Sequence, residues 1–462
     1  MKNVVLLSAA VLHLAIILAG CQPPPSEPQP GVRDPGVRGG DPGAGGPLPG
    51  LTADELLFFN DGQTKFLDIE GVPDGLGPRF NSNQCSSCHI QPAIGGTSPA
   101  RNPLIAVATL EGARNRIPWF IVEDGPIREA RIKKNADGTP NGGVVALFVI
   151  SGRSDAGSCN IAQPDFLPAG NPHTGQGGNP NVVFRIPTPV FGAGLIEAIP
   201  DAAILANMYA NATMKEEMGI RGHPNAHISG TANLSGNDGT ITRFGWKAQN
   251  KSLLIFSAEA YNVEMGITNH LFPQERDNTP GCLLNPTPED AVSFSANENT
   301  SVISDVEAFA IFQRLLAPPT PAPETPSTAR GRALFSSIGC AACHTPSMTT
   351  GPQIKSGSAT IPSAALSNQV VNLYSDLLLH NMGEKLADGI AQGAAGPDEF
   401  RTAPLWGVGK RIFFLHDGRT TDLVEAIEAH RSKGSEANKV IERFNKLTSQ
   451  EEQDIINFLR SL

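Results

Sequence analysis

The chain has 462 residues, enough for two or three domains with hydrophobic cores of their own. Only 6% of the residues are aromatic, whereas 48 are glycine and 39 are proline, so we expect long loops. The formal net charge of −10 argues against nucleic acid as a partner and leaves a soluble partner protein open.

Residues 1–20 predict a signal peptide. Lys2 precedes an apolar run from Val4 to Leu18 that is too short to span a membrane comfortably. The Leu-Ala-Gly-Cys sequence that ends at Cys21 resembles the cleavage and lipidation site of a bacterial lipoprotein, and an ordinary secretory signal is the alternative. Gln22 stands where inner-membrane lipoproteins usually carry Asp. We therefore expect a periplasmic or cell-surface protein with a lipid anchor, in the outer membrane rather than the inner one.

A Pro/Gly-rich tether is expected over residues 21–50. Residues 22–50 contain 9 prolines and 8 glycines and show no periodic apolar pattern, which is typical of a linker. Thr52 and Glu55 then form a capping-box pattern ahead of an apolar run, which predicts the first helix of the folded part.

The pattern Cys-x-x-Cys-His occurs twice, at Cys85, Cys88 and His89 and again at Cys340, Cys343 and His344. It is the attachment pattern of c-type haem. Two thiols on one helical turn can each bond a haem vinyl group, and the histidine that follows ligates the iron. A zinc ribbon also uses two cysteine pairs, but it places them close together and requires no histidine after each. We therefore expect two covalently bound haems.

Between about 100 and 250 the sequence predicts a β-rich insertion that shields one haem. Three short runs rich in apolar and β-branched residues lie between Gly, Asn and Asp residues and read as strands: Leu104–Leu110, Trp119–Val122 and Val144–Ile150. The polar, Gly-rich stretch 225–242 predicts a loop.

Two amphipathic helices should close the haem units. One runs from Ser304 to Leu316 and ends at a Pro-rich linker, 317–326. The other is the last helix of the chain, where Thr448 and Glu451 form a capping box. Ser327 is the expected N-cap of the helix that leads to the second haem motif.

The order helix, haem motif, closing helix is typical of a cytochrome c domain. The sequence therefore predicts a mainly α protein with two such domains, 51–316 and 327–462, and with the β-rich insertion in the first. Cys159 and Cys282 remain after haem attachment and lipidation, and in an oxidising compartment they most simply form a disulfide; two buried thiols are the alternative.

Several segments together resemble the di-haem oxidoreductase family, once called thiol oxidoreductases. This family is a branch of the bacterial dihaem cytochrome c peroxidase and methylamine-utilisation dihaem enzyme superfamily. The resemblance covers about 50–462 and rests on the two haem motifs and on 243–248, 377–383, 401–407 and 413–430.

The resemblance implies that His430 is the second axial ligand of the C-terminal haem, opposite His344. Relatives carry Met or Tyr at the position that His430 occupies. A haem with two histidine ligands lacks the thioether that raises the reduction potential, so a low potential is expected. From the residues alone, His430 could instead be a solvated residue that complements a helix C-terminus.

Glu264 matches the family's distal glutamate over the N-terminal haem, where a carboxylate can move a proton between the two oxygens of peroxide. The alternative is a glutamate on a helix surface. The family also has a glutamine about ten residues earlier, where this chain has 254–256, so a more apolar pocket is expected. No histidine follows the first haem motif before His173. This favours a haem that is already open, and a ligand from a spare histidine such as His223 is a lesser alternative.

Trp246 matches the family's tryptophan between the haems, which carries electrons, although a core tryptophan is the alternative. His416 is expected to hydrogen-bond near a haem propionate. The family also implies a calcium ion between the domains, with ligands that this sequence does not identify.

The resemblance thus implies an exported peroxidase that reduces hydrogen peroxide at the N-terminal haem. Electrons from a partner protein or a small donor pass through the C-terminal haem. A lipid-anchored electron carrier and a dihaem oxygenase are the alternatives. The older thiol-oxidation label has little support, because no free cysteine is evidently placed to react.

Overall fold

The computed structural model describes residues 31–166, 180–226, 241–291, 304–356, 359–361 and 363–462. The expected signal peptide and Cys21 lie outside them. Residues Val32–Leu462 form one compact unit. Its α-helices are α1 (Ala53–Leu67), α2 (Cys85–Cys88), α3 (Leu104–Val107), α4 (Ala193–Ala198), α5 (Asp201–Tyr209), α6 (Ala212–Met218), α7 (Leu253–Met265), α8 (Asp305–Leu315), α9 (Pro326–Ile338), α10 (Leu423–Ala429), α11 (Asn438–Phe444) and α12 (Ser449–Ser461).

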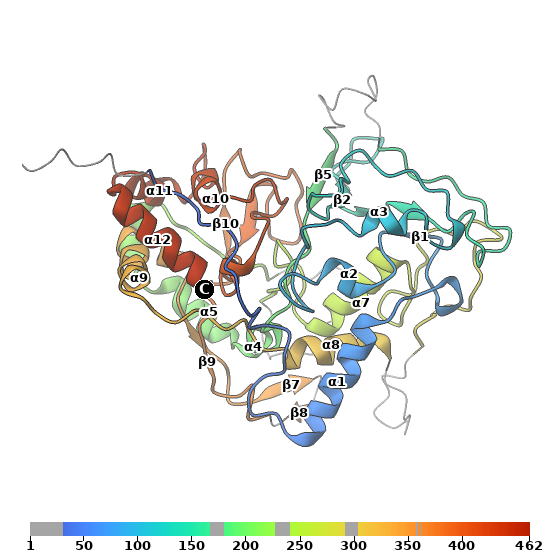
Figure 1. The fold of residues 1–462 in the computed structure, drawn as a ribbon, viewed down its shortest axis with the longest axis horizontal. Helices are drawn as coiled ribbons and strands as arrows, with labels where there is room; N and C mark the ends of the chain where they lie inside the picture. Colours follow the sequence, from blue (N-terminus) through green and yellow to red (C-terminus); the bar gives the residue numbers. More distant parts are fainter. Residues whose placement is uncertain (1–30, 167–179, 227–240, 292–303, 357–358, 362) are drawn as a thin grey trace, which may run out of the picture. The chain divides into compact units, whose positions relative to one another are not determined.

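The strands are short, and every pairing between them is antiparallel. Three of them form a sheet in the order β3-β2-β5, and the others pair as β1–β4, β6–β9, β7–β8 and β10–β11. Their bounds are β1 (Arg79–Phe80), β2 (Glu129–Ile132), β3 (Val144–Val145), β4 (Phe148–Val149), β5 (Val182–Arg185), β6 (Met348–Thr349), β7 (Ile354–Ser356), β8 (Ala359–Ile361), β9 (Val370–Val371), β10 (Leu379–Asn381) and β11 (Glu399–Arg401). The fold is thus helix-rich with small sheets (Figure 1).

Each haem motif follows the first helix of a helix pair, and the two pairs are similar. Helix α1 packs against α8, and α9 packs against α12. Each pair crosses at a glycine. A Cβ on Gly62 of α1 would lie 2.5 Å from the carbonyl oxygen of Ala308, and one on Gly331 of α9 would lie 1.9 Å from that of Asp454. Since no side chain fits in either space, glycine permits both close crossings.

A phenylalanine four residues after each glycine reaches the histidine of the neighbouring motif. The rings of Phe66 and His89 have centroids 6.2 Å apart, and those of Phe335 and His344 are also 6.2 Å apart. The same glycine-to-phenylalanine spacing therefore supports both motifs, although this chain separates the first phenylalanine from its motif by a longer loop. The division into two separate domains at 317–326 stays a prediction.

Helix boundaries agree with the expected caps except at α9. The capping boxes of Thr52 with Glu55 and of Thr448 with Glu451 are present, and the Ser304 side chain accepts a hydrogen bond from the backbone N–H of Glu307. The expected cap at Ser327 is wrong: α9 begins at Pro326, and Thr325 is its N-cap. Proline has no N–H to leave unpaired, so it suits the first helical position.

The segment between 100 and 250 contains helices as well as strands, so the expected β-rich insertion is only partly correct. The run Val144–Ile150 does hold β3 and β4, but Leu104–Leu110 begins with α3 and Trp119–Val122 forms a turn. The Asn102 side chain accepts from the backbone N–H of Leu104, and the N–H of Ile121 donates to the carbonyl of Pro118. These local bonds compete with strand pairing.

Residues 32–50 differ from the expected free tether. Asp34 and Arg460 form an ion pair of 2.6 Å, and both side chains are buried. The backbone N–H of Leu48 donates to the carbonyl of Leu315, and Lys410 binds two carbonyls of the segment. In Figure 1 the blue trace before α1 accordingly runs along the folded unit toward α10. Proline and glycine content predicted an irregular backbone correctly but not its packing.

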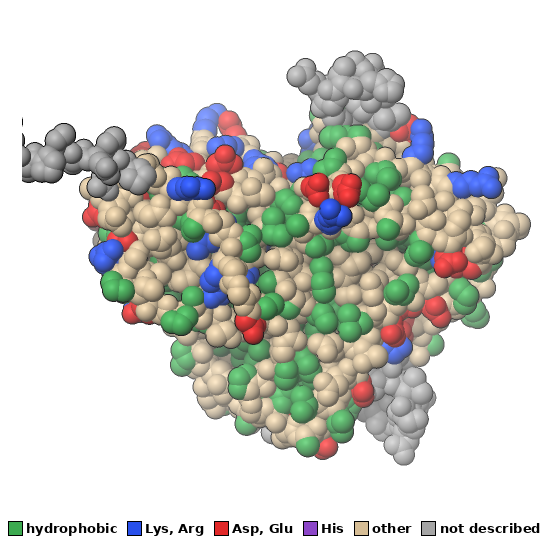
Figure 2. All heavy atoms as spheres, in the orientation of Figure 1, with side chains coloured by type: hydrophobic (Ala, Val, Ile, Leu, Met, Phe, Trp, Pro, Cys, Tyr) green, Lys and Arg blue, Asp and Glu red, His purple; other side chains and the backbone are tan. Residues whose placement is uncertain are grey.

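Cys159 and Cys282, the pair expected from the sequence, are joined by a disulfide. The other described cysteines, those of the two haem motifs, are unpaired. None of the helices in the described ranges combines the length and the hydropathy needed to cross a bilayer. On the face in Figure 2 the acidic and basic side chains are dispersed, and neither sign forms a continuous patch.

Candidate haem sites

Two large cavities lie beside the two Cys-x-x-Cys-His motifs. The first cavity encloses about 1250 Å³ including its opening, and Cys85, Cys88 and His89 line one side of it. The second cavity has a volume of about 1440 Å³, which also includes its opening. Cys340, Cys343 and His344 line it. The walls of both are mostly apolar.

The histidines of the two motifs are oriented by the same kind of hydrogen bond. His89 Nδ1 lies 3.0 Å from the carbonyl oxygen of Gly96, and His344 Nδ1 lies 3.0 Å from that of Tyr374. A carbonyl accepts only, so Nδ1 carries the proton and Nε2 keeps its lone pair. Metal-ligating histidines are usually held in this way, and the two residues therefore fit an axial haem ligand.

His430 has the same arrangement and lines the second cavity together with His344. It is the C-cap residue of α10, and its Nδ1 donates to the carbonyl of Ala426 over 2.7 Å. Burial, together with the neighbouring His430, lowers the pKa of His344 to about 4. Burial also lowers the pKa of His430. Both rings are thus neutral at pH 7, as ligands must be.

Glu264 lies in the wall of the first cavity, at the end of α7. Asn81 Nδ2 donates to Glu264 Oε2 over 2.7 Å, and the Glu264 carboxyl also shares a hydrogen bond with the carboxyl of Glu129. Burial and the charge of Glu129 raise the pKa of Glu264 well above its usual value. A hydrogen bond between two carboxyl groups requires a proton on one of them, and the proton belongs to Glu264.

Glu129, which the sequence analysis did not single out, begins β2 and lines the same cavity. Burial would raise its pKa, but Arg131 and the hydrogen bond with Glu264 lower it overall. Arg131 Nε donates to Glu129, and Arg131 Nη1 donates to the carbonyl of Gly142 over 2.9 Å. The alternation of Glu129 and Arg131 along one strand was a visible signal, but nothing in the sequence placed this strand beside α7.

Two glutamines add polar groups to the first cavity, where the sequence predicts a more apolar pocket. Phe256 does line the first cavity, but so does Gln249, which lies earlier in the chain than the place where the glutamine was sought. Its Oε1 is buried and lacks a hydrogen-bond partner among the described residues. Gln313 from α8 also reaches the wall. The segment before α7 turns back at Gly245, and this turn brings Gln249 to the cavity.

Trp246 lies between the cavities and lines both of them. Its indole N–H donates to the carbonyl of Ile186 over 2.9 Å. His416 packs edge-on against Trp246, with ring centroids 6.3 Å apart, and stacks on Phe400 at 4.3 Å. His416 also lines the second cavity. Its expected hydrogen bond near a haem propionate stays a prediction. Burial lowers the pKa of His416 to about 4.

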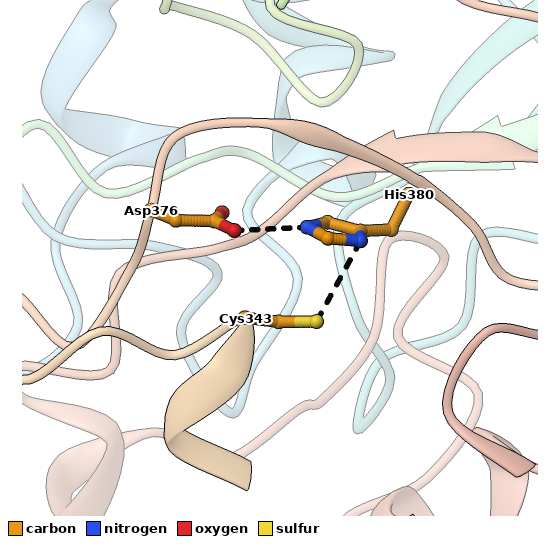
Figure 3. Close-up of side chains that lie close together, drawn as sticks. All are labelled: Cys343, Asp376 and His380. Carbon is orange, nitrogen blue, oxygen red and sulfur yellow. Dashed lines mark hydrogen bonds and ion pairs between the residues drawn. The ribbon is translucent and has the colours of Figure 1, made fainter. Parts of the chain in front are cut away.

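A further cluster lies beside the second motif (Figure 3). His380 Nε2 lies 2.9 Å from Asp376 Oδ2, and Nδ1 lies 3.6 Å from Cys343 Sγ. Among the described residues, these three form the one group that could hold a metal ion. Glu436 also contacts His380 Nδ1, at 2.7 Å, so both ring nitrogens are occupied. Because Cys343 belongs to the haem motif, we count the cluster as a support of that motif and not as a separate metal site.

The remaining histidines do not complete the first cavity. His89 is the one histidine among the described residues that line it. His223 contacts Glu399 at 2.9 Å, away from both cavities, while His173 and His227 lie outside the described residues. The structure therefore brings together one histidine and a carboxyl pair in the first cavity, and two histidines in the second.

Two cavities, each lined by a Cys-x-x-Cys-His motif and both lined by one tryptophan, define a two-haem redox protein. The family model "Di-haem oxidoreductase, putative peroxidase" matches residues 179–462, more than half of the chain, and the chain belongs to this family. The matched range includes the second motif and not the first. No curated protein matches the chain.

The solved structures that match this chain are distant from it in sequence. A MauG-like protein associated with microbial copper homeostasis is 18% identical, with a TM-score of 0.24 over 34% of this chain and 52% of that protein. The chain thus spans about half the length of that relative. The diheme peroxidase BthA from Burkholderia thailandensis is 14% identical, with a TM-score of 0.29 over 73% and 94%. Hydrazine synthase from Kuenenia stuttgartiensis is 15% identical, with a TM-score of 0.28 over 59% and 87%.

Proposed function

We propose that this family member is an exported peroxidase that reduces hydrogen peroxide at the first cavity and draws electrons through the second. In this proposal both haems are of the c type. Cys85 and Cys88 bond one of them, and Cys340 and Cys343 bond the other. The family supports the presence of two haems, and the four unpaired thiols support covalent attachment.

The difference between the two cavities carries the proposal. In the second, His344 and His430 both offer an unprotonated Nε2, which suits a closed electron-transfer haem. In the first, His89 is the single histidine among the described lining residues, and the Glu129–Glu264 pair lies in the wall. An open haem beside a proton-carrying group can do chemistry, whereas a haem with two protein ligands carries electrons.

The bound haem supplies the site where peroxide oxygen binds and where electrons arrive. Reduction of one H₂O₂ takes two electrons and two protons and yields two water molecules. Glu129, as a carboxylate, can accept a proton from the inner oxygen, and Glu264 can donate its proton to the outer oxygen as the O–O bond breaks. The pair gains and loses one proton, so it is restored when the proton on Glu129 returns to Glu264. The two electrons and two protons from solvent convert the inner oxygen to the second water molecule.

Trp246 is the proposed route for the electrons, because it lines both cavities. Its packing against His416 and, through His416, against Phe400 keeps the ring in one position. The electron donor is a partner protein or a small reductant that transfers electrons to the haem of the second cavity.

The proposed location rests on the first residues of the sequence. We propose cleavage before Cys21, lipidation of that cysteine and an outer-membrane anchor, with the folded unit in the periplasm or at the cell surface. Metabolic labelling with a fatty-acid probe tests this, with Cys21→Ser as the variant that should lose the label. The calcium ion implied by the family stays a prediction.

Electron paramagnetic resonance of the protein as isolated, before and after peroxide, tests the function. We expect one high-spin and one low-spin ferric signal, and loss of the high-spin signal when peroxide is added. Two low-spin signals without a response to peroxide would favour the electron carrier instead. Substrate turnover under oxygen in the presence of catalase would favour the oxygenase.

A further inference from the structure

Two arginines lie side by side in the wall of the second cavity. Arg401 is the last residue of β11, and Arg411 follows the short turn Val408–Lys410. Their exposed fractions are 9% and 7%. Both also line a smaller third cavity of about 540 Å³, which lies on the Trp246 side of the second. Two guanidinium groups are thus buried at the junction of the cavities.

Neither guanidinium group has an acidic partner among the residues that the structure describes. Arg401 Nε donates to the carbonyl of Gly245 over 3.0 Å and its Nη1 to the carbonyl of Thr402 over 3.4 Å, so the backbone satisfies part of this guanidinium. Arg411 Nε and Nη2 are buried and have no hydrogen-bond partner among the described residues. Burial lowers the pKa of each arginine to about 10, and the charge of Arg411 contributes to the shift of Arg401. Both groups are still charged at pH 7.

Other buried arginines of this chain are paired with carboxylates. Arg460, whose side chain donates to the backbone of Arg411, forms an ion pair of 2.6 Å with Asp34. Arg185 forms one of 2.6 Å with Asp388. An unpaired charge in the interior is costly, and a fixed guanidinium fork matches a carboxylate. The arrangement at Arg401 and Arg411 is therefore complete only with an anionic ligand.

We propose that Arg401 and Arg411 bind the carboxylate groups of the molecule that occupies the second cavity. These are the two haem propionates, so the inference rests on the proposed function. When bound, that haem would direct its carboxylates to the wall that Arg401, Arg411 and Trp246 share. The backbone N–H of Arg401 donates to the carbonyl of Trp246 over 2.9 Å, and this bond ties the carboxylate site to the tryptophan.

Spectroelectrochemistry of the haem-loaded protein tests the proposal with Arg411→Gln, Arg411→Lys and Arg401→Gln. Loss of either charge leaves a buried carboxylate uncompensated, which favours the ferric state. We expect the reduction equilibrium constant of the low-spin haem to fall at least tenfold in both Gln variants, about 59 mV for one electron. The potential of those variants should also become pH-dependent, because their propionates can take up a proton. Arg411→Lys should stay close to the wild type.

Arg332→Gln is the matched control, since Arg332 is an exposed arginine of α9 that pairs with Glu324. It should leave the potential unchanged. If the Gln variants match the wild type at every pH, the carboxylate site is refuted although the haem is present. A wild-type potential that shifts with chloride or phosphate concentration would assign the arginines to a free anion and overturn the propionate assignment. Absence of any low-spin haem would instead refute the proposed function.

Discussion

The carboxyl groups of Glu129 and Glu264 share a hydrogen bond in the wall of the first cavity. Arg131 favours the charged form of Glu129, and burial favours the neutral form of Glu264. The pair therefore holds one proton. Glu129 can accept a proton and Glu264 can donate one within the same cavity. Two titratable groups whose environments push their pKa values apart are typical of acid–base sites.

Replacement of Glu264 should reduce peroxide turnover strongly. Glu264→Gln keeps the shape of the side chain and removes its exchangeable proton, so we expect a loss of about 10²–10⁴-fold in kcat/KM. Peroxide consumption with an artificial electron donor measures it. Glu123→Gln, a change at an exposed residue, should have no effect.

Replacement of Glu129 should change the pH dependence. Glu129→Gln removes the negative charge that helps to raise the pKa of Glu264, so Glu264 ionises at lower pH. The fall in rate on the alkaline side should then begin at a lower pH than in the wild type. An unshifted profile would show that the two carboxyl groups act independently.

Replacement of His430 should change the spin state or the potential of the haem in the second cavity, because His430 is its proposed second axial ligand. With His430→Ala, we expect the low-spin ferric signal to become high-spin, because one axial ligand is lost. With His430→Met, the haem should stay low-spin and its potential should rise, since a thioether favours the ferrous state. His223→Gln serves as the control, because His223 contacts Glu399 away from both cavities. Low-spin spectra in all three variants would remove His430 from the ligand set.

Trp246 should control electron transfer between the haems. Trp246→Phe replaces the indole by a smaller aromatic ring and removes the hydrogen bond from the indole N–H to the carbonyl of Ile186. Stopped-flow mixing of reduced protein with peroxide should show slower oxidation of the second haem, while the first still reacts. Trp119→Phe, at a tryptophan with 43% of its surface exposed, should leave both rates unchanged. Equal rates in the wild type and Trp246→Phe would show that electrons take another route.

Glu70 should make stability depend on pH. Its carboxylate accepts from the Tyr261 hydroxyl over 3.0 Å, and burial raises its pKa from 4.5 to about 7. The native state therefore binds more protons than the unfolded state between these values, so the free energy of unfolding falls as pH rises from 4.5 to 7. The contribution is at most about 3 kcal/mol.

Chemical denaturation of Glu70→Gln across this range checks the prediction. The variant should lack this part of the slope and should be the more stable protein at pH 8. Glu216→Gln, at an exposed residue, should keep the wild-type slope. The prediction fails if Glu70→Gln and the wild type lose stability in parallel.

The disulfide between Cys159 and Cys282 should stabilise the fold. Its removal in the Cys159→Ser, Cys282→Ser double variant should lower the free energy of unfolding by about 2–5 kcal/mol, because the unfolded chain regains freedom. Guanidinium titration measures the change. The reduction potentials of the haems should be unaffected, since neither cysteine lines either of the large cavities.

Local patterns in the sequence were sufficient for the parts of this protein that depend on neighbours in the chain. The two Cys-x-x-Cys-His motifs and the caps at Thr52, Ser304 and Thr448 each act within a few residues. The resemblance to the family added Trp246 and His430, and the structure places both in the cavity walls.

Other features required tertiary structure because their partners are distant in the sequence. Glu129 and Glu264 are far apart in the sequence and meet only in the wall of the first cavity. The charges of Arg401 and Arg411 likewise meet only after β11 and the turn at Val408–Lys410 have folded. Residues 32–50 illustrate the same limit, since their composition indicated a linker and Arg460 holds them in place. The sequence by itself determined the two haem-attachment motifs, because each depends on five consecutive residues. Burial and long-range contacts decided that Glu129 lies beside Glu264, and that Arg401 and Arg411 have no carboxylate partner among the described residues.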